Sequence, residues 1–173
     1  MSEPVSFDPR SAVISPDELQ GRIILVTGAS QGIGRAVAFS CAEHGATVLL
    51  LGRNGRHLSE VHAKISSQYG PERAAIVEFD LENALARDYD ALFAAIEERY
   101  QRLDGLLHNA GMLGQLAPIE HYDVPTWCRV LQVNLTAAFV LTQILLPLLK
   151  RSEDASIVFT SRSEERRVGK ECA

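Results

Sequence analysis

Three glycines follow a short apolar run near the start of the chain. Residues 23–34 read I-I-L-V-T-G-A-S-Q-G-I-G, which places glycines at positions 28, 32 and 34. Glycine lets a backbone turn tightly and lets a phosphate approach it, while a following helix offers free N–H groups and the positive end of its dipole. The pattern therefore predicts a site for the pyrophosphate of a dinucleotide. Glycines that simply close a turn are the alternative, but the strand pattern before them and the helix pattern after them favour a phosphate site.

A single arginine follows the second apolar run, where the adenosine ribose of a dinucleotide would lie. The run T-V-L-L-L occupies residues 47–51, and Gly52, Arg53 and Asn54 follow it. An acid at this position binds the ribose 2′-hydroxyl of NAD, whereas an arginine suits the 2′-phosphate of NADP. A guanidinium pairs with a phosphate through two hydrogen bonds. NADP is therefore the predicted cofactor, with NAD as the second candidate, and a solvated arginine in a turn is the alternative.

Strand and helix patterns that alternate along the chain must position these residues. Apolar, β-branched runs predict strands, and amphipathic segments predict helices between them. The predicted strands are 23–26, 47–51, 74–78, 103–107 and 157–161, and the predicted helices are 33–44, 55–69, 85–100 and 125–150. This alternation is typical of a doubly wound α/β fold with a mostly parallel sheet.

Composition limits the class of protein. The 173 residues suffice for one domain, 46% of them are hydrophobic, and the net charge is −5. That charge offers no basic surface for nucleic acid or for a membrane. No uninterrupted apolar run approaches the roughly 18 residues that span a bilayer, and the first residues do not resemble a secretory signal. The three cysteines lack metal-site spacing, so no metal is expected, and they suggest reduced thiols in a cytoplasmic protein.

Two further motifs follow the glycine turn, whose spacing is T-G-x-x-x-G-x-G. His108, Asn109, Ala110 and Gly111 form one of them, and V-N-L-T around Asn134 is the other. In this order they resemble the short-chain dehydrogenase/reductase family, whose corresponding motifs are N-N-A-G and a catalytic asparagine. The resemblance covers about residues 21–161. It implies a Rossmann fold with the strand order 3-2-1-4-5-6-7, of which strands 6 and 7 are missing here.

The resemblance also implies a role for each matched residue. The expected cofactor contacts are Gly28, Ser30, Gln31, Gly32, Ile33 and Gly34 at the pyrophosphate, Arg53 at the 2′-phosphate, Asp80 and Leu81 at the adenine, and Asn109, Ala110 and Gly111 at the nicotinamide side. Asn134 corresponds to the catalytic asparagine, which holds a water of the family's proton relay. Asp80 as a helix cap and Asn134 as a kink-forming residue are the alternatives. His108 replaces the family's first asparagine, and we interpret it as a hydrogen-bonded structural residue.

The implied chemistry is hydride transfer between NADP(H) and a carbonyl or alcohol carbon of a small-molecule substrate. In the family a tyrosine, and a lysine four residues later, handle the proton. None of the chain's tyrosines is followed by a lysine at that spacing. We therefore expect an inactive fragment of an oxidoreductase. A non-enzymatic NADP sensor, and a nucleotide fold that binds S-adenosylmethionine, are the rival interpretations.

Residues 125–150 are apolar on nearly every side, which predicts a helix that is covered on more than one face. We expect one face to pack on the sheet and Trp127 to lie in the core. The resemblance implies that the other face meets a second subunit in a homodimer or homotetramer.

The two ends of the chain differ in character from its middle. Residues 1–20 contain three prolines and predict a loosely ordered leader before the domain, with one helical turn starting at Ser15. Residues 162–172 read R-S-E-E-R-R-V-G-K-E-C and resemble a translated DNA-sequencing adapter, codon for codon. We therefore expect a truncated domain over residues 21–161 and an artefactual tail over residues 162–173.

Overall fold

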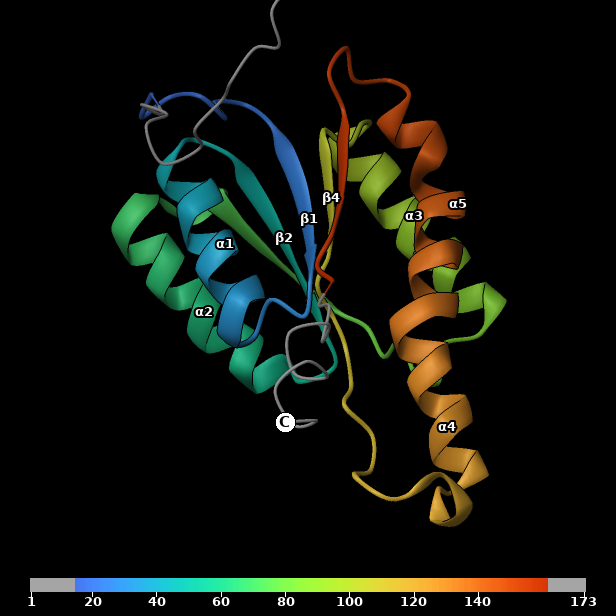
Figure 1. The fold of residues 1–173 in the computed structure, drawn as a ribbon. Coiled ribbons are helices and arrows are strands. Elements are labelled where there is room, and N and C mark those ends of the chain that lie inside the picture. The colour runs from blue at the N-terminus through green and yellow to red at the C-terminus, as the bar shows by residue number, and fades with distance from the viewer. Residues whose placement is uncertain (1–14, 162–173) are drawn as a thin grey trace, which may run out of the picture.

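The structure is a computed structural model that describes residues 15–161. Strands and helices alternate through this range (Figure 1). The strands are β1 (Ile23–Thr27), β2 (Thr47–Gly52), β3 (Ala74–Glu78), β4 (Gly105–His108) and β5 (Ser156–Phe159). The helices are α1 (Gly32–Glu43), α2 (Gly55–Tyr69), α3 (Ala86–Tyr100), α4 (Val124–Leu131) and α5 (Ala137–Leu149), with short 3₁₀ turns at Pro71–Arg73 and Ile119–His121. The predicted leader (1–20) lies partly, and the predicted tail (162–173) wholly, outside the described residues, so both stay predictions.

All five strands form one parallel sheet in the order β3-β2-β1-β4-β5. Central β1 pairs with β2 on one side, where Val26 is opposite Leu50, and with β4 on the other, where Val26 is opposite Leu107. The predicted doubly wound fold and its strand order are confirmed. Each strand's carboxyl end points to the same edge of the sheet, which brings the predicted cofactor residues to that edge.

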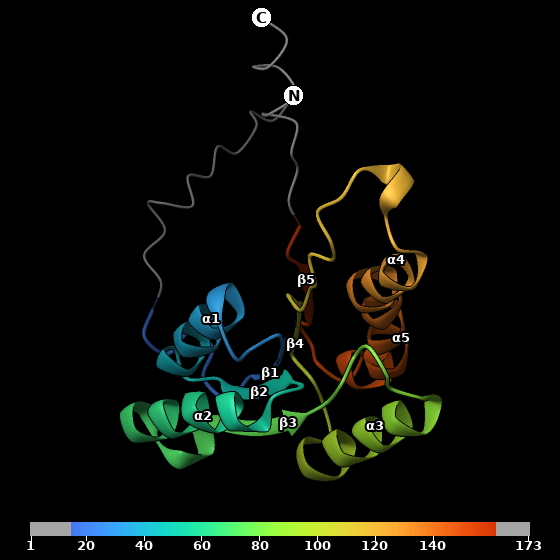
Figure 2. The same cartoon turned by 90° about the horizontal axis from the view of Figure 1, so that it is seen from below.

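Helices lie on both faces of the sheet (Figure 2), and a hydrophobic cluster lies between each face and its helices. Side chains that alternate along a strand point to opposite faces, so neighbouring Leu25 and Val26 belong to different clusters. Val26 packs with α1 and α2, through residues such as Ala38 and Leu58. Leu25 packs with α3 and α5, through residues such as Leu141. Both faces of the sheet are therefore filled, as a parallel sheet requires.

The predicted helix 125–150 is one helical stretch with a different winding in its middle. A π-helical segment, Gln132–Thr136, joins α4 to α5. On α5 the buried face includes Leu141, Leu145 and Leu148, which confirms that one side packs on the sheet. Trp127 is 50% exposed, so its predicted place in the core is wrong. It rests on the edge of Tyr122 instead, with ring centroids 6.2 Å apart.

By length and composition alone, Val124–Leu149 would suffice to cross a membrane, with a mean hydropathy of 1.6. Only 17% of the residues in its most apolar stretch are buried, but the buried leucines of α5 lie against the sheet. Length and hydropathy alone do not distinguish a membrane-spanning helix from the core helix of a soluble protein.

Several bounds differ by one residue from the predicted ones. Larger differences concern the segment after Ser15, the start of β4, and β5, which covers Ser156–Phe159 rather than 157–161. The expected helical turn after Ser15 is a series of hydrogen-bonded turns, with the Glu18 N–H donating to the Ser15 carbonyl at 3.1 Å. β4 begins at Gly105 rather than at residue 103. The Leu103 N–H bonds to the Leu148 carbonyl of α5 at 3.2 Å, and the pairing with β1 begins at Gly105, opposite Ile24. At the far edge, β5 pairs only with β4, and all four of its residues are exposed.

Candidate functional site

The glycine turn between β1 and α1 is packed so closely that two of its glycines, Gly28 and Gly34, have no room for side chains. Gly28 and Gly32 have φ values of +65° and +55°, in the left-handed region that favours glycine. A Cβ on Gly28 would lie 2.9 Å from the Cα of Ala110. A Cβ on Gly34 would lie 2.5 Å from the Gly28 carbonyl oxygen and would also clash with the Asn109 amide. The turn is therefore held against the segment that follows β4.

The first turn of α1 offers unused hydrogen-bond donors. Its N-cap residue, Gln31, makes no side-chain capping bond, and the first helical bond runs from the Arg35 N–H to the Gln31 carbonyl at 3.2 Å. The N–H groups before Arg35 have no acceptor within the helix. Gln31, Gly32 and Ile33 are exposed. This end of α1 is therefore suited to an anion.

A buried threonine joins the carboxyl ends of β1 and β4. The Thr27 hydroxyl accepts hydrogen bonds from the N–H groups of Asn109 at 2.9 Å and Ala110 at 3.0 Å, and donates to the Leu107 carbonyl at 3.2 Å. The Asn109 side-chain amide donates a hydrogen bond to the Thr27 carbonyl at 3.3 Å. Thr27 was not among the predicted site residues, although it stands in the motif directly before Gly28.

Arg53 lies at the end of β2, as the sequence pattern requires, but it has a partner that the sequence did not reveal. Its side chain is 70% exposed, and its Nη1 lies 3.4 Å from Oε2 of Glu82. The other oxygen of Glu82 lies 3.8 Å from Nη1 of Arg129 on α4. The Glu82 side chain is only 16% exposed. A carboxylate thus does stand beside the predicted ribose position, although none is adjacent to it in sequence.

Asp80 and Leu81 follow β3 at the same edge of the sheet. The Asp80 carboxylate accepts bonds from the Glu82 N–H at 3.0 Å and the Asn83 side chain at 2.8 Å. It therefore shapes its own turn. Its alternative role as a helix cap is wrong, because α3 begins at Ala86 with Leu85 as N-cap. Leu81 is buried in the core.

Asn134 lies within the π-helical segment and fixes the loop after β4. Its Oδ1 accepts from the Met112 N–H at 2.8 Å, and its Nδ2 donates to the Met112 carbonyl at 3.0 Å. A Cβ on neighbouring Gly111 would make an ordinary contact of 3.5 Å with the same Oδ1. π-helical segments are frequent at functional sites because they break the regular hydrogen-bond ladder.

His108 is held in one neutral form at the end of β4. It is 6% exposed, it stacks on Phe159 with ring centroids 4.6 Å apart, and its Nε2 lies 2.9 Å from the Thr142 hydroxyl. That hydroxyl donates to the Ala138 carbonyl, so it accepts from His108. Burial lowers the pKa of His108 from 6.5 to about 4. These contacts agree with the predicted structural role.

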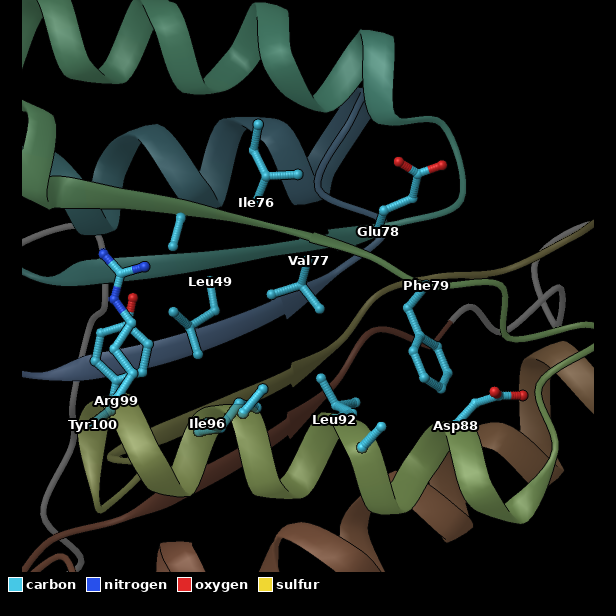
Figure 3. Close-up of a pocket in the computed structure, with 13 residues that line it drawn as sticks. Leu49, Ile76, Val77, Glu78, Phe79, Asp88, Leu92, Ile96, Arg99 and Tyr100 are labelled. Carbon is cyan, nitrogen blue, oxygen red and sulfur yellow. The ribbon is translucent and has the colours of Figure 1, made fainter.

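The described residues form two hollows of very different size, and predicted site residues line only the smaller one. Leu81, Ala110 and Asn134 line a small hollow of about 50 Å³. A larger groove, of about 440 Å³, lies between β3 and α3 and includes Val77, Leu92 and Arg99 (Figure 3). None of the predicted cofactor residues lines that groove. Within residues 15–161, no three His, Cys, Asp or Glu side chains are grouped to hold a metal ion.

Comparison with known proteins gives relatives of one kind. The chain is 47% identical over 147 residues to the oxidoreductase YciK of Escherichia coli K12, across 85% of this chain and 58% of that protein. A short chain dehydrogenase structure from Pseudomonas syringae is 50% identical, with a TM-score of 0.85, and the match covers 90% of this chain and 62% of that one. A Shigella flexneri short chain dehydrogenase complexed with NADP is 45% identical, with a TM-score of 0.82 and coverage of 88% and 64%.

The chain spans between 58% and 64% of the length of these relatives. A sequence model of the short chain dehydrogenase family matches residues 22–170. The glycine turn, the strand order and these relatives therefore agree, and the chain belongs to the short-chain dehydrogenase family.

Proposed function

We propose that the chain is the cofactor-binding part of an NADP-preferring oxidoreductase, which in its full-length form transfers hydride between NADP(H) and a carbonyl or alcohol substrate. The observation that carries this proposal is the tight β1–α1 turn, where Gly28 and Gly34 leave no room for side chains beside the uncapped start of α1. An anion fits such a cradle. The NADP complex of the Shigella flexneri relative supports the choice of cofactor.

Each part of the cofactor has candidate contacts along the carboxyl edge of the sheet. We assign the pyrophosphate to Gly28, Ser30, Gln31, Gly32, Ile33 and Gly34, the 2′-phosphate to Arg53, the adenine to Asp80 and Leu81, and the nicotinamide side to Asn109, Ala110 and Gly111. The nicotinamide would supply or accept the hydride. Asn134, whose side chain holds the Met112 backbone, would shape the loop beside the reacting groups.

The 173-residue chain should bind the cofactor without turning over a substrate, because its sequence contains no tyrosine followed four residues later by lysine. The second candidate is a non-enzymatic NADP sensor. The two candidates differ in the full-length gene. A Tyr-x-x-x-Lys motif soon after β5 would indicate the enzyme, and its absence would indicate the sensor.

The partner we propose is a second copy of the full-length chain. Leu135 and Phe139 are each 64% exposed on the outer face of the α4–α5 stretch, and Trp127 extends the same stretch toward its start. Such an apolar surface suits a second copy of the full-length chain, as a homodimer or homotetramer in the cytoplasm. Sedimentation of wild type and of Phe139→Glu tests this, because an unchanged molecular mass would exclude the surface.

The cofactor proposal is tested by titrating the chain with NADPH and NADH. We expect Gly34→Ala to abolish binding of both, because its Cβ would collide with Gly28 and Asn109. Arg53→Gln should weaken NADPH binding by about tenfold and leave NADH binding unchanged, since it removes a charge-assisted phosphate contact.

Gly21→Ala is the matched control. Gly21 has a positive φ of +73°, which Gly34 does not, but a Cβ there would meet nothing within 4 Å, and it lies outside the candidate site. This variant should lose some stability and keep its cofactor affinity. Wild-type protein that binds neither dinucleotide, or a Gly34→Ala protein that binds as wild type does, would contradict the proposal.

A further inference from the structure

The site at the end of β2 contains a carboxylate between two arginines. Glu82, in the loop between β3 and α3, lies 3.4 Å from Arg53 and 3.8 Å from Arg129. We propose that Glu82 is a specificity-determining residue, which competes with the 2′-phosphate for Arg53 and so reduces the preference for NADP over NAD. This inference rests on the proposed function, because it assumes that the adenosine ribose lies beside Arg53.

The competition follows from the geometry of the arginine. A guanidinium binds a phosphate best through two parallel N–H groups, and in this structure Nη1 of Arg53 is directed to Glu82. A 2′-phosphate must therefore replace the carboxylate or share the arginine with it. The two anions would then lie close together, and like charges at that distance repel. Both effects weaken NADP binding and leave the affinity for NAD unaffected, since NAD has a hydroxyl in place of the phosphate.

The exchange is feasible because Glu82 would keep a partner. A mostly buried carboxylate that loses its only counter-charge is strongly destabilised. Glu82 is 16% exposed, and Arg129 is positioned by its own hydrogen bond to the Thr126 hydroxyl at 2.8 Å. When Arg53 turns to the phosphate, Arg129 can still neutralise Glu82. Arg129 therefore acts on the cofactor preference through Glu82, although it sits on α4.

A carboxylate in this place also suits NAD directly. In dinucleotide-binding folds an acid accepts a hydrogen bond from the ribose 2′-hydroxyl, while an arginine accommodates the 2′-phosphate. The site therefore contains both determinants, Arg53 from the β2–α2 turn and Glu82 from the β3–α3 loop. We infer that the chain accepts both cofactors, with a preference for NADP that Glu82 limits.

Dissociation constants of NADPH and NADH, measured on the 173-residue chain, test the inference. Glu82→Gln should bind NADPH about three- to fivefold more tightly, as expected for loss of one partly exposed ion pair. It should bind NADH no more tightly than wild type does, because an amide oxygen is a weaker acceptor for the 2′-hydroxyl than a carboxylate. Arg129→Gln should act in the opposite direction, because Glu82 would then depend on Arg53 alone. Its affinity for NADPH should fall while its affinity for NADH stays the same.

Two controls separate this effect from a change in net charge or stability. Glu97→Gln removes the carboxylate of a comparable ion pair, with Arg151 at 2.6 Å, at the other end of α3, and should alter neither affinity. In an Arg53→Gln background, Glu82→Gln should lose most of its effect on NADPH. Adenosine 2′,5′-bisphosphate and adenosine 5′-monophosphate should repeat the pattern, because they differ only in the 2′-phosphate.

The outcomes distinguish the inference from the function on which it rests. If wild type binds neither dinucleotide, the proposed function fails and the inference fails with it. If Arg53→Gln reduces NADPH binding while Glu82→Gln and Arg129→Gln both behave like Glu97→Gln, the function stands and only the role of Glu82 is overturned. Opposite shifts of NADPH affinity in Glu82→Gln and Arg129→Gln support it.

Discussion

The two edges of the sheet use their polar groups in opposite ways. At the amino-terminal edge, the Asp104 carboxylate is 4% exposed and accepts bonds from the Ile23 N–H at 2.8 Å, the Ser152 hydroxyl at 2.6 Å and the Arg102 guanidinium at 3.1 Å. The Asp104 carbonyl also accepts from the Ser156 N–H at 3.1 Å. One residue therefore joins the starts of β1, β4 and β5.

The carboxyl-terminal edge leaves its donors available. Thr27 joins β1 and β4 there, but the first turn of α1 has N–H groups without helical acceptors and no side-chain cap. Polar groups that are satisfied internally stabilise the fold, whereas unsatisfied groups at the surface can bind a ligand. The comparison separates the two edges: the amino ends of the strands satisfy their polar groups internally, and the carboxyl ends keep open donors at the start of α1. The following predictions test that separation, beginning with the largest expected effect.

Asp104→Ala should lower the free energy of unfolding by about 3 kcal/mol, because it removes the buried acceptor that Ile23, Ser152 and Arg102 share. Urea unfolding followed by circular dichroism measures the loss. Asp154→Ala is the control, since Asp154 pairs with Arg22 but is 81% exposed. A change near zero is expected for it. Equal effects of the two substitutions would show that Asp104 does not anchor this edge.

His108 should make the fold less stable as pH falls from about 6.5 to about 4. Its pKa is lowered by burial from 6.5 to about 4, so in this window the unfolded chain binds a proton that the folded chain does not. Stability contributed by neutral His108 is complete above pH 6.5, and the loss reaches on the order of 3 kcal/mol at pH 4. His108→Gln, which keeps a donor toward Thr142, should flatten this part of the unfolding profile. An unchanged slope would show that His108 titrates normally.

Asp104 should affect the stability of the fold at lower pH than His108 does, so the contributions of the two edges can be separated by pH. Burial alone would raise the pKa of Asp104, but its hydrogen bonds from Ser152, Ile23 and Arg102 outweigh burial and hold the pKa below 3.8. Its contribution to stability is therefore present above pH 3.8 and is lost as pH falls further.

Thr27→Val should cost about 2 kcal/mol of stability, because the hydroxyl accepts two backbone N–H bonds in a position that is 1% exposed. Thr47→Val, which removes an exposed bond to the Glu72 carbonyl, should cost much less. Thermal unfolding of the two valine variants tests this difference. Similar melting temperatures would mean that the β1–β4 junction is not held by Thr27.

Asn54→Ala should cost about 1 kcal/mol, since Asn54 caps α2 by accepting from the His57 N–H at 3.1 Å. Gln31→Ala, at the start of α1, should change stability by only a few tenths of a kcal/mol because Gln31 makes no capping bond. Chemical unfolding of both variants compares the two helix starts directly. A large loss of stability in Gln31→Ala would contradict the conclusion that the first N–H groups of α1 have no side-chain acceptor.

Local signals predicted much of this fold. α2 and β3 match their predicted bounds to the residue, since Asn54 and the Gly70-Pro71 pair mark the ends of α2. Long-range contacts account for what was missed. The later start of β4 accompanies a bond from the Leu103 N–H to the Leu148 carbonyl, which is distant in sequence.

The candidate site likewise has a part that the sequence revealed and a part that it did not. The glycine turn is contiguous, so its spacing revealed it, whereas Glu82 is 29 residues from Arg53 and no motif links them. The exposure of Trp127 was missed because a stretch that is apolar all round does not indicate which side faces the sheet.

The π-helical segment between α4 and α5 has a consequence for how the protein tolerates insertions and deletions. An α-helix turns by about 100° per residue, so losing a single codon within Gln132–Thr136 would rotate all of α4 by that angle against α5. Asn134 would then swing away from Met112, and Arg129 from Glu82. The five-residue π-helical segment thus sets the phase that aligns α4 with the loops after β3 and β4.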